Sequence, residues 1–182
     1  MAGAAGATGN MAHQLAATGR VIMYDGVCNL CNAAVRFIIK RDPQKNLLFC
    51  SVQSPKAEPY LRGLGFSRGD ALKRFIFIQE DRWSEGSTAA LEIAGYMRPP
   101  WPLLKSLMAA VPLPVREAVY DIVAANRYSW FGRSKVCQVP DTSVLERFLD
   151  AEDLVLGRCR EQAMADDAWK EERERHWQRW GK

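Results

Sequence analysis

The fold is decided by the stretch Val21-Ile22-Met23-Tyr24-Asp25-Gly26-Val27-Cys28-Asn29-Leu30-Cys31. Residues 21–24 form a short apolar run of the kind that builds a buried strand. After a tight turn, apolar residues recur at helical spacing from Cys28 to Arg41, where Asp42-Pro43 ends the pattern. The stretch therefore predicts a strand that leads directly into a helix, with two cysteines in the first helical turn.

The residues that follow continue this alternation of strands and helices. Residues 47–50 predict a second strand, and residues 55–64 predict a second helix. Residues 74–78 predict a third strand that pairs, after a turn, with a short fourth one. Ser87 is expected to cap a helix that runs to about Tyr96, because serine accepts hydrogen bonds from free amides of the first turn. The order β-α-β-α-β-β-α predicts a layered α/β domain.

Helical segments extend the chain beyond this domain. A proline-rich break at residues 98–102 precedes two predicted helices, near 103–110 and 115–127. We expect the domain to cover residues 21–140, with its helical extension beginning at about residue 98. Residues 141–182 are rich in charge and predict a helical tail that is interrupted near Gly157.

Composition and charge exclude several classes of protein. The chain has 182 residues, of which 48% are hydrophobic and 25% charged, close to the average of globular proteins. Its net charge of +4 comes from scattered basic residues with no dense block, so nucleic-acid binding is not expected. No apolar run approaches the roughly 18 residues that a spanning helix needs, so no transmembrane segment is expected.

Cysteine and histidine usage limits the chemistry further. The odd number of cysteines differs from the even number that is typical of secreted disulfide frameworks. His13 and His176 both lie near the ends of the chain, so a Cys–His catalytic pair or a Cys/His zinc site in the domain is not expected. The cysteines are Cys28, Cys31, Cys50, Cys137 and Cys159.

The pair Cys28 and Cys31 is the strongest chemical feature of the sequence. A helix N-terminus carries partial positive charge and unpaired amides, which favour a thiolate at Cys28. The thiolate is the attacking species in disulfide exchange, and Cys31 lies one helical turn away, within reach of a mixed disulfide. A zinc or iron–sulfur site and two inert buried cysteines are the alternatives. A CxxC pair beside a β-α-β pattern favours the redox interpretation, in which Cys28 is the more exposed thiol.

The motif Asp25-x-x-Cys28-x-x-Cys31 resembles the signature of the DCC family of thiol-disulfide oxidoreductases. The sequence around the motif is similar to that of family members found in plant and algal organelles. The resemblance implies a thioredoxin- or glutaredoxin-like fold and exchange with protein or small-molecule disulfides, without metal or dissociable cofactor. Cys28 would be the nucleophile and Cys31 the resolving thiol. The similar segments are Gln53-Ser54, residues 86–90 and residues 126–132, and they end near Cys137.

Asp25 is the third candidate residue of the site. It could accept hydrogen bonds from the amides of the turn, or it could take a proton from Cys31 as a general base. A negative charge close to Cys28 opposes a thiolate there, which favours the structural role. The chain also departs from the better-known thioredoxins, because Asn29-Leu30 contains no proline and residues 72–75 lack the proline that usually faces the cysteines.

Two other cysteines could join the site. Cys50 ends the second strand, at the sheet edge where Tyr24 ends the first one, so it is either a third redox cysteine or a buried strand-end residue. Cys137 follows the segment 126–132 and could fold back to the same edge.

Two features point to partners or to a cellular location. The tail contains Trp169, Trp177 and Trp180 roughly on one helical face, which suits docking on another protein or on the domain itself. A structural subunit of a larger organellar assembly is therefore the alternative to an enzyme, and a small metal-binding module is the second alternative. Residues 1–20 contain no acidic residue and predict a flexible tail or targeting remnant, for a mitochondrion or chloroplast, with the cytoplasm as the alternative.

An apolar stripe on the first predicted helix of the extension is expected to pack onto the sheet. Its residues are Leu103, Leu104, Leu107, Met108 and Val111.

Overall fold

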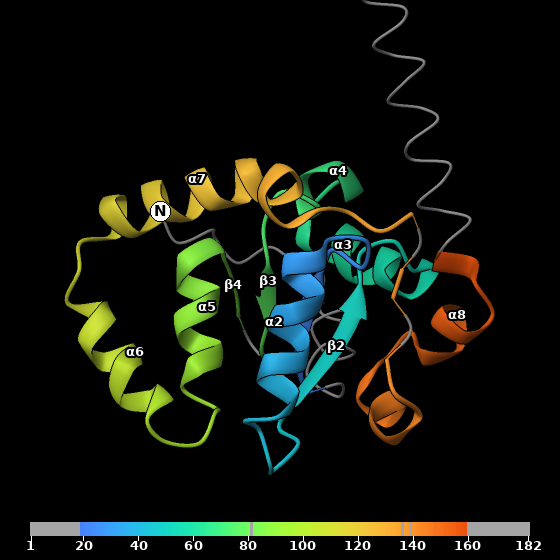
Figure 1. Ribbon diagram of the computed structural model, residues 1–182, viewed down its shortest axis with the longest axis horizontal. Helices are drawn as coiled ribbons and strands as arrows, with labels where there is room; N and C mark the ends of the chain where they lie inside the picture. Colours follow the sequence, from blue (N-terminus) through green and yellow to red (C-terminus); the bar gives the residue numbers. More distant parts are fainter. Residues whose placement is uncertain (1–18, 81, 136, 139, 160–182) are drawn as a thin grey trace, which may run out of the picture.

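A four-stranded mixed sheet forms the centre of the computed structural model, which describes residues 19–80, 82–135, 137–138 and 140–159 (Figure 1). The strand order is β2-β1-β3-β4, with β1 parallel to β2 and antiparallel to β3, and with β3 antiparallel to β4. The strands are β1 (Arg20–Tyr24), β2 (Leu47–Ser51), β3 (Ile76–Ile78) and β4 (Trp83–Glu85).

Helices cover both faces of this sheet. Ile22, Phe49 and Phe77 pack on one face against α2 and α5, whereas Val21 and Met23 pack on the other face against α3 and its neighbours. Helix α7 runs across the top of the sheet, where β1 ends (Figure 1). The helices are α2 (Asn29–Ile39), the 3-10 helix η1 (Pro55–Ala57), α3 (Glu58–Leu64), α4 (Arg68–Ala71), α5 (Gly86–Ala94), α6 (Trp101–Ala109), α7 (Leu113–Phe131), the 3-10 helix η2 (Thr142–Arg147) and α8 (Ala151–Val155).

This architecture confirms the predicted thioredoxin-like α/β fold. The β1-α2-β2 crossover and the β3–β4 hairpin lie where the apolar pattern placed them. Helix α4 was not predicted, and Ser87 is not the cap of α5: the capping position is Glu85, and the Ser87 hydroxyl donates instead to Glu117 Oε1 at 2.5 Å. The Ser87 hydroxyl, which was predicted to cap the helix, therefore donates to the carboxylate of Glu117 on α7 instead.

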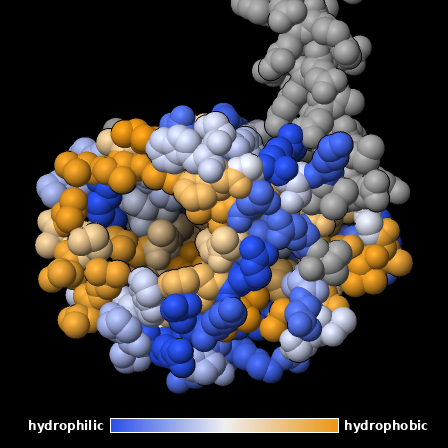
Figure 2. Space-filling view, viewed as in Figure 1, coloured by the Kyte–Doolittle hydropathy of each residue, from blue (hydrophilic) through white to orange (hydrophobic). Residues whose placement is uncertain are grey.

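The apolar stripe on α6 does not pack onto the sheet, so that expectation is wrong. Leu103 is 72% exposed and Leu107 is 66% exposed, because α6 packs beside α5 and reaches away from the sheet. Figure 2 shows apolar side chains gathered over α6 and the beginning of α7. In the described part of the chain, no helix is long and apolar enough to cross a membrane.

The C-terminal segment lies along the outer edge of β2. Phe148 bridges to Phe49 in parallel, and the Leu149 amide donates to the Phe49 carbonyl at 2.9 Å. The expected tail therefore begins as η2 and α8 beside the sheet, and the predicted interruption is present as a left-handed turn at Gly157, with a φ of 76°. Trp169, Trp177 and Trp180 lie outside the described residues.

A buried ion pair fastens this segment to the entry of β2. Arg147 Nη2 donates to Asp42 Oδ2 at 2.5 Å and to the Leu47 carbonyl at 2.8 Å, and both charged side chains are almost fully buried. Asp42 Oδ2 also accepts from the Leu47 amide at 3.0 Å. The two side chains thereby neutralise each other and also provide hydrogen-bond partners for the amide and carbonyl of Leu47 in β2.

We predict that Arg147→Met lowers the free energy of unfolding by about 3 kcal/mol or more, because it leaves the buried charge of Asp42 without its partner. Urea unfolding followed by circular dichroism measures the change. Glu146→Gln is the matched control, since Glu146 pairs with Lys45 at the surface and its loss should leave the midpoint nearly unchanged. Equal effects of the two substitutions would contradict the assignment.

Candidate functional site

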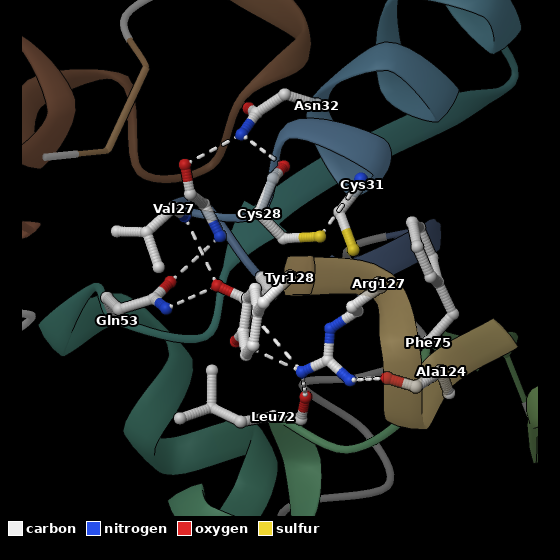
Figure 3. A network of polar contacts seen from close by, with 12 residues as sticks. Val27, Cys28, Cys31, Asn32, Gln53, Leu72, Phe75, Ala124, Arg127 and Tyr128 are labelled. Carbon is white, nitrogen blue, oxygen red and sulfur yellow. Dashed lines mark hydrogen bonds and ion pairs between the residues drawn. The ribbon is translucent and has the colours of Figure 1, made fainter. Parts of the chain in front are cut away.

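Cys28 and Cys31 lie together at the N-terminus of α2 (Figure 3). Cys28 is the capping residue, with extended backbone (φ −80°, ψ 121°), and its Sγ accepts from the Cys31 amide at 3.4 Å. The two sulfurs lie side by side (Figure 3), and each thiol shifts the pKa of the other. The predicted proximity of the two sulfurs is therefore present, and one of the free amides of the helix start is directed at the Cys28 sulfur.

This arrangement separates the acidities of the two thiols. The hydrogen bond from Cys31 is the main cause that lowers the pKa of Cys28 to about 7, with support from the Cys31 amide and the charge of Arg127. Burial and the charge of Asp25 oppose this shift. The same hydrogen bond, together with burial, raises the pKa of Cys31. Cys28 is therefore the thiol that ionises near neutral pH, and Cys31 keeps its proton.

The expectation that Cys28 is the more exposed thiol is wrong. Cys28 is 0% exposed and Cys31 is 6% exposed. Residues Gly132–Ser134, here called the cover segment, lie over the start of α2: Arg133 forms a bridge with Cys28, and the Ser134 amide donates to the Val27 carbonyl at 2.8 Å. Local periodicity cannot reveal this contact, because the two segments are about 100 residues apart in sequence.

The side chain of Asn29 holds the cover segment in place. Its Nδ2 donates to the Phe131 carbonyl at 2.9 Å, and its Oδ1 accepts from Ser134 Oγ at 3.1 Å and from Gln138 Nε2 at 3.0 Å. Gly132 has a φ of 80°, which lets the chain leave α7 and turn across α2. Asn29, the residue that follows Cys28, thus fixes the position of the cover segment and of the residues on either side of it.

Asp25 lies in the turn before Cys28 and is almost fully buried. Its Oδ1 accepts from the Val27 amide at 3.2 Å and from Gln53 Nε2 at 2.8 Å. Its Oδ2 accepts from the Tyr128 hydroxyl and pairs with Arg127 Nη2 at 3.4 Å. Because both oxygens hold parts of the fold together, these contacts favour the structural role over the role of a general base.

A pocket of about 280 Å³ opens beside Cys31, between α2, α5 and α7. Apolar side chains form most of its wall, and the charged residues Asp25, Lys73, Arg74 and Arg127 also line it. The loop before β3 also contributes: the Leu72 carbonyl accepts from Arg127 Nη2 at 2.6 Å. The loop that lacks the expected proline is therefore held by an arginine of α7. The apolar lining includes Leu30, Ala34, Ile38, Phe75, Ile93 and Val123.

The other two candidate cysteines have different positions. Cys50 packs on the opposite face of the sheet, with α3, and burial raises its pKa, so the structure does not bring it to the CxxC pair. Cys137 does fold back to the strand ends, where its Sγ lies 3.8 Å from Ser51 Oγ. Its neighbour there is Cys159, which the sequence did not connect to any site.

Several residues around the pair have roles that were not predicted from the sequence. Arg127, Tyr128 and Gln53 all contact Asp25, and each lies in a segment that carries the family resemblance. Those segments were the only signal that could have found them. Among the described residues, no group of three or more His, Cys, Asp or Glu side chains is arranged to hold a metal ion. That part of the chain therefore offers the metal-module hypothesis no support.

The fold and the thiol pair define a thioredoxin-like domain with a dithiol at a helix N-terminus. A family model described as DCC1-like thiol-disulfide oxidoreductase matches residues 22–133, so the chain belongs to this family and the expected membership is confirmed. The chain is 45% identical over 130 residues to the "Uncharacterized protein YuxK" of Bacillus subtilis (strain 168), covering 71% of this chain and 93% of that protein. It is 35% identical over 119 residues to the "DCC family protein At1g52590, chloroplastic" of Arabidopsis thaliana, covering 65% of this chain and 69% of that protein. No solved structure matches the chain.

We predict that Arg127→Met raises the pKa of Cys28 above about 7, because the guanidinium no longer offsets the charge of Asp25. For a rise of one pKa unit, the thiolate content at pH 7 should fall about fivefold, because Cys28 is half ionised when its pKa equals the pH. The pH dependence of Cys28 alkylation by iodoacetamide measures the shift.

The matched control is Arg116→Met on the same helix, where the guanidinium contacts the Val111 carbonyl and Ser87 rather than the thiols. Identical alkylation profiles for the two variants and the unchanged chain would show that Arg127 does not tune Cys28.

Proposed function

We propose that the chain exchanges its Cys28–Cys31 dithiol with disulfides of proteins or small molecules. The observation that carries this proposal is a pair of neighbouring thiols at a helix N-terminus, one with a lowered pKa (Cys28) and one with a raised pKa (Cys31). A thiolate at Cys28 is formed near neutral pH, and the protonated thiol of Cys31 lies beside it. Membership of a family of thiol-disulfide oxidoreductases supports the same chemistry.

The exchange proceeds in two balanced steps. The Cys28 thiolate attacks one sulfur of a substrate disulfide, which releases the first substrate thiol and leaves a mixed disulfide on Cys28. Cys31 then loses its proton and attacks Cys28 Sγ, which releases the second substrate thiol and closes the Cys28–Cys31 disulfide. Two electrons pass from the pair to the substrate, and the reverse sequence oxidises a substrate dithiol.

Burial of Cys28 requires that the cover segment move before a substrate arrives. The cover segment is held by a few hydrogen bonds: the Asn29 side chain bonds to Ser134 within it, and to Phe131 and Gln138 on either side of it. Loops that open and close over a reactive group are a common way to restrict which molecules reach it. We propose that the closed form protects the thiolate from small oxidants and that a substrate binds the open form.

The pocket beside Cys31 supports a preference for apolar substrates. It lies next to the resolving thiol, and most of its wall is apolar. A substrate with an apolar side chain or ring near its sulfur would bury that group there and gain affinity from the removal of apolar surface from water.

A role as a structural or accessory subunit is the second candidate function. The exposed apolar side chains of α6 and α7, including Leu103, Leu107, Val119 and Ile122, form a surface larger than scattered single residues. The proposed docking role of Trp169, Trp177 and Trp180 belongs to this candidate. The name of the Arabidopsis relative supports an organellar location, and the Bacillus relative suits the cytoplasmic alternative.

We predict that the two cysteine substitutions fail differently. Cys28→Ser should abolish disulfide reduction, because serine is not ionised at neutral pH. Cys31→Ser should still attack but should accumulate a mixed disulfide, because no resolving thiol remains. Incubation with a disulfide-bonded peptide, followed by intact-mass measurement with and without dithiothreitol, detects the adduct.

Cys50→Ser serves as the control, because Cys50 lies on the other face of the sheet and its loss should leave turnover unchanged. Turnover by the Cys28→Ser chain, or the absence of any adduct on Cys31→Ser, would refute the proposed exchange. An adduct only on Cys31 in the Cys28→Ser chain would place the attack on the pocket side instead.

We also predict that Asn29→Ala speeds alkylation of Cys28 severalfold at saturating pH, because loss of three hydrogen bonds favours opening of the cover segment. Peptide mass mapping after timed treatment with iodoacetamide gives the rate at each cysteine. Asn126→Ala is the control, since its side chain donates to the Ile122 carbonyl within α7. An unchanged rate for Asn29→Ala would argue against the cover segment as the barrier.

A further inference from the structure

A second pair of thiols lies apart from the CxxC motif. Cys137 Sγ donates to the Cys159 carbonyl at 3.5 Å, and each of the two thiols shifts the pKa of the other, that of Cys137 downward and that of Cys159 upward. Cys137 is 6% exposed and Cys159 is 0% exposed. The exchange reaction described above uses neither sulfur, so the close approach of two buried thiols needs a separate explanation.

The surroundings of this pair are close-packed and polar. Ser51 Oγ lies 3.8 Å from Cys137 Sγ, and a Cβ atom on Gly26 would lie 3.0 Å from the same sulfur. Cys159 Sγ donates to Asp150 Oδ2 at 3.8 Å. Three segments that are distant in sequence therefore hold the two sulfurs: the turn after β1, the end of β2, and the C-terminal segment around α8.

Asp150 provides an independent observation at the same place. This carboxyl group is fully buried, and its Oδ2 accepts from the Ser51 amide at 2.9 Å. Its Oδ1 has no hydrogen-bond partner among the described residues. Burial raises the pKa of Asp150 to about 7. Burying a carboxyl group beside Cys159 lowers the stability of the fold, so packing does not explain its presence. The carboxyl group lies where it can accept the proton that the Cys159 thiol must lose before it forms a disulfide.

We propose that Cys137 and Cys159 form a second dithiol–disulfide couple, separate from Cys28 and Cys31, whose oxidation links the C-terminal segment covalently to the loop after α7, beside the end of β2. The buried contact between the two thiols and the adjacent carboxyl group of Asp150 carry this assignment. The couple does not depend on the proposed exchange function of the CxxC pair.

A small-molecule disulfide is the oxidant that balances the reaction. The Cys137 thiolate attacks one sulfur of the disulfide and expels the first small thiol, which leaves a mixed disulfide on Cys137. Cys159 passes its proton to Asp150 and attacks Cys137 Sγ, which expels the second small thiol. The pair loses two electrons and two protons, and the oxidant becomes two thiols. Because both sulfurs are buried, the oxidant must reach them through local opening of the C-terminal segment.

The experiment uses the full chain with Cys28→Ser and Cys31→Ser, which retains three thiols, Cys50, Cys137 and Cys159. After equilibration with excess oxidised glutathione, the free thiols are counted in denaturant and the disulfides are mapped by tryptic peptide mass. We expect the count to fall from three to one per chain, with a linked peptide pair that contains Cys137 and Cys159. Circular dichroism verifies that this variant is folded.

Two further chains serve as controls. Adding Cys159→Ser to the double variant should stop the loss of two thiols, whereas adding Cys50→Ser should leave the same linked pair and no free thiol. Retention of all three thiols in the folded double variant, a link that involves Cys50, or only glutathione adducts would overturn the proposal.

The unsubstituted chain covers the case in which the double variant does not fold. It should lose four thiols and give two linked pairs, and the single Cys159→Ser variant should lose two and link Cys28 to Cys31. Failure of the Cys28–Cys31 link alone would count against the exchange function and would leave the second couple standing. Failure of the Cys137–Cys159 link in the oxidised unsubstituted chain would overturn the second couple.

Discussion

The buried carboxylate of Asp25 joins the parts of the chain that the candidate site needs. It accepts from the Val27 amide within its own turn, from Gln53 beyond β2, and from Tyr128 on α7, and it forms an ion pair with Arg127. Removing a carboxylate from water costs several kcal/mol unless hydrogen bonds and an opposite charge replace the lost solvent. The site therefore forms only when β2 and α7 are both in place, and the position of α7 in turn fixes the cover segment over Cys28.

The same constraint sets the chemistry of the two thiols. A lone carboxylate beside Cys28 would oppose a thiolate, and the Arg127 guanidinium offsets it. Gln53 carries the network to the second thiol pair, because Ser51 Oγ donates to Gln53 Oε1 at 2.7 Å and lies 3.8 Å from Cys137 Sγ. Charge compensation at one turn thus serves both the packing of the domain and the acidity of its cysteines.

Local sequence patterns predicted the parts of the fold that depend on neighbours in sequence. The apolar run at residues 21–24 and the periodic residues after Cys28 gave β1 and α2, and the spacing of the two cysteines brought them into one helical turn. Burial of Cys28 could not be predicted, since it depends on where residues 132–134 dock after a long helix. The exposed face of α6 was missed for a related reason: an apolar stripe shows that a face avoids water but does not show what covers it.

The distance in sequence between Cys28 and the cover segment has a consequence for biosynthesis. Asn29 and its partner Phe131 are separated by 102 residues, so the thiols leave the ribosome long before the chain that buries them. At a synthesis rate of about 5 to 20 residues per second, the nascent chain exposes both sulfurs for about 5 to 20 s. The redox state in which the domain closes is therefore set by the compartment in which translation or import ends, before the folded protein can control access to its own cysteines.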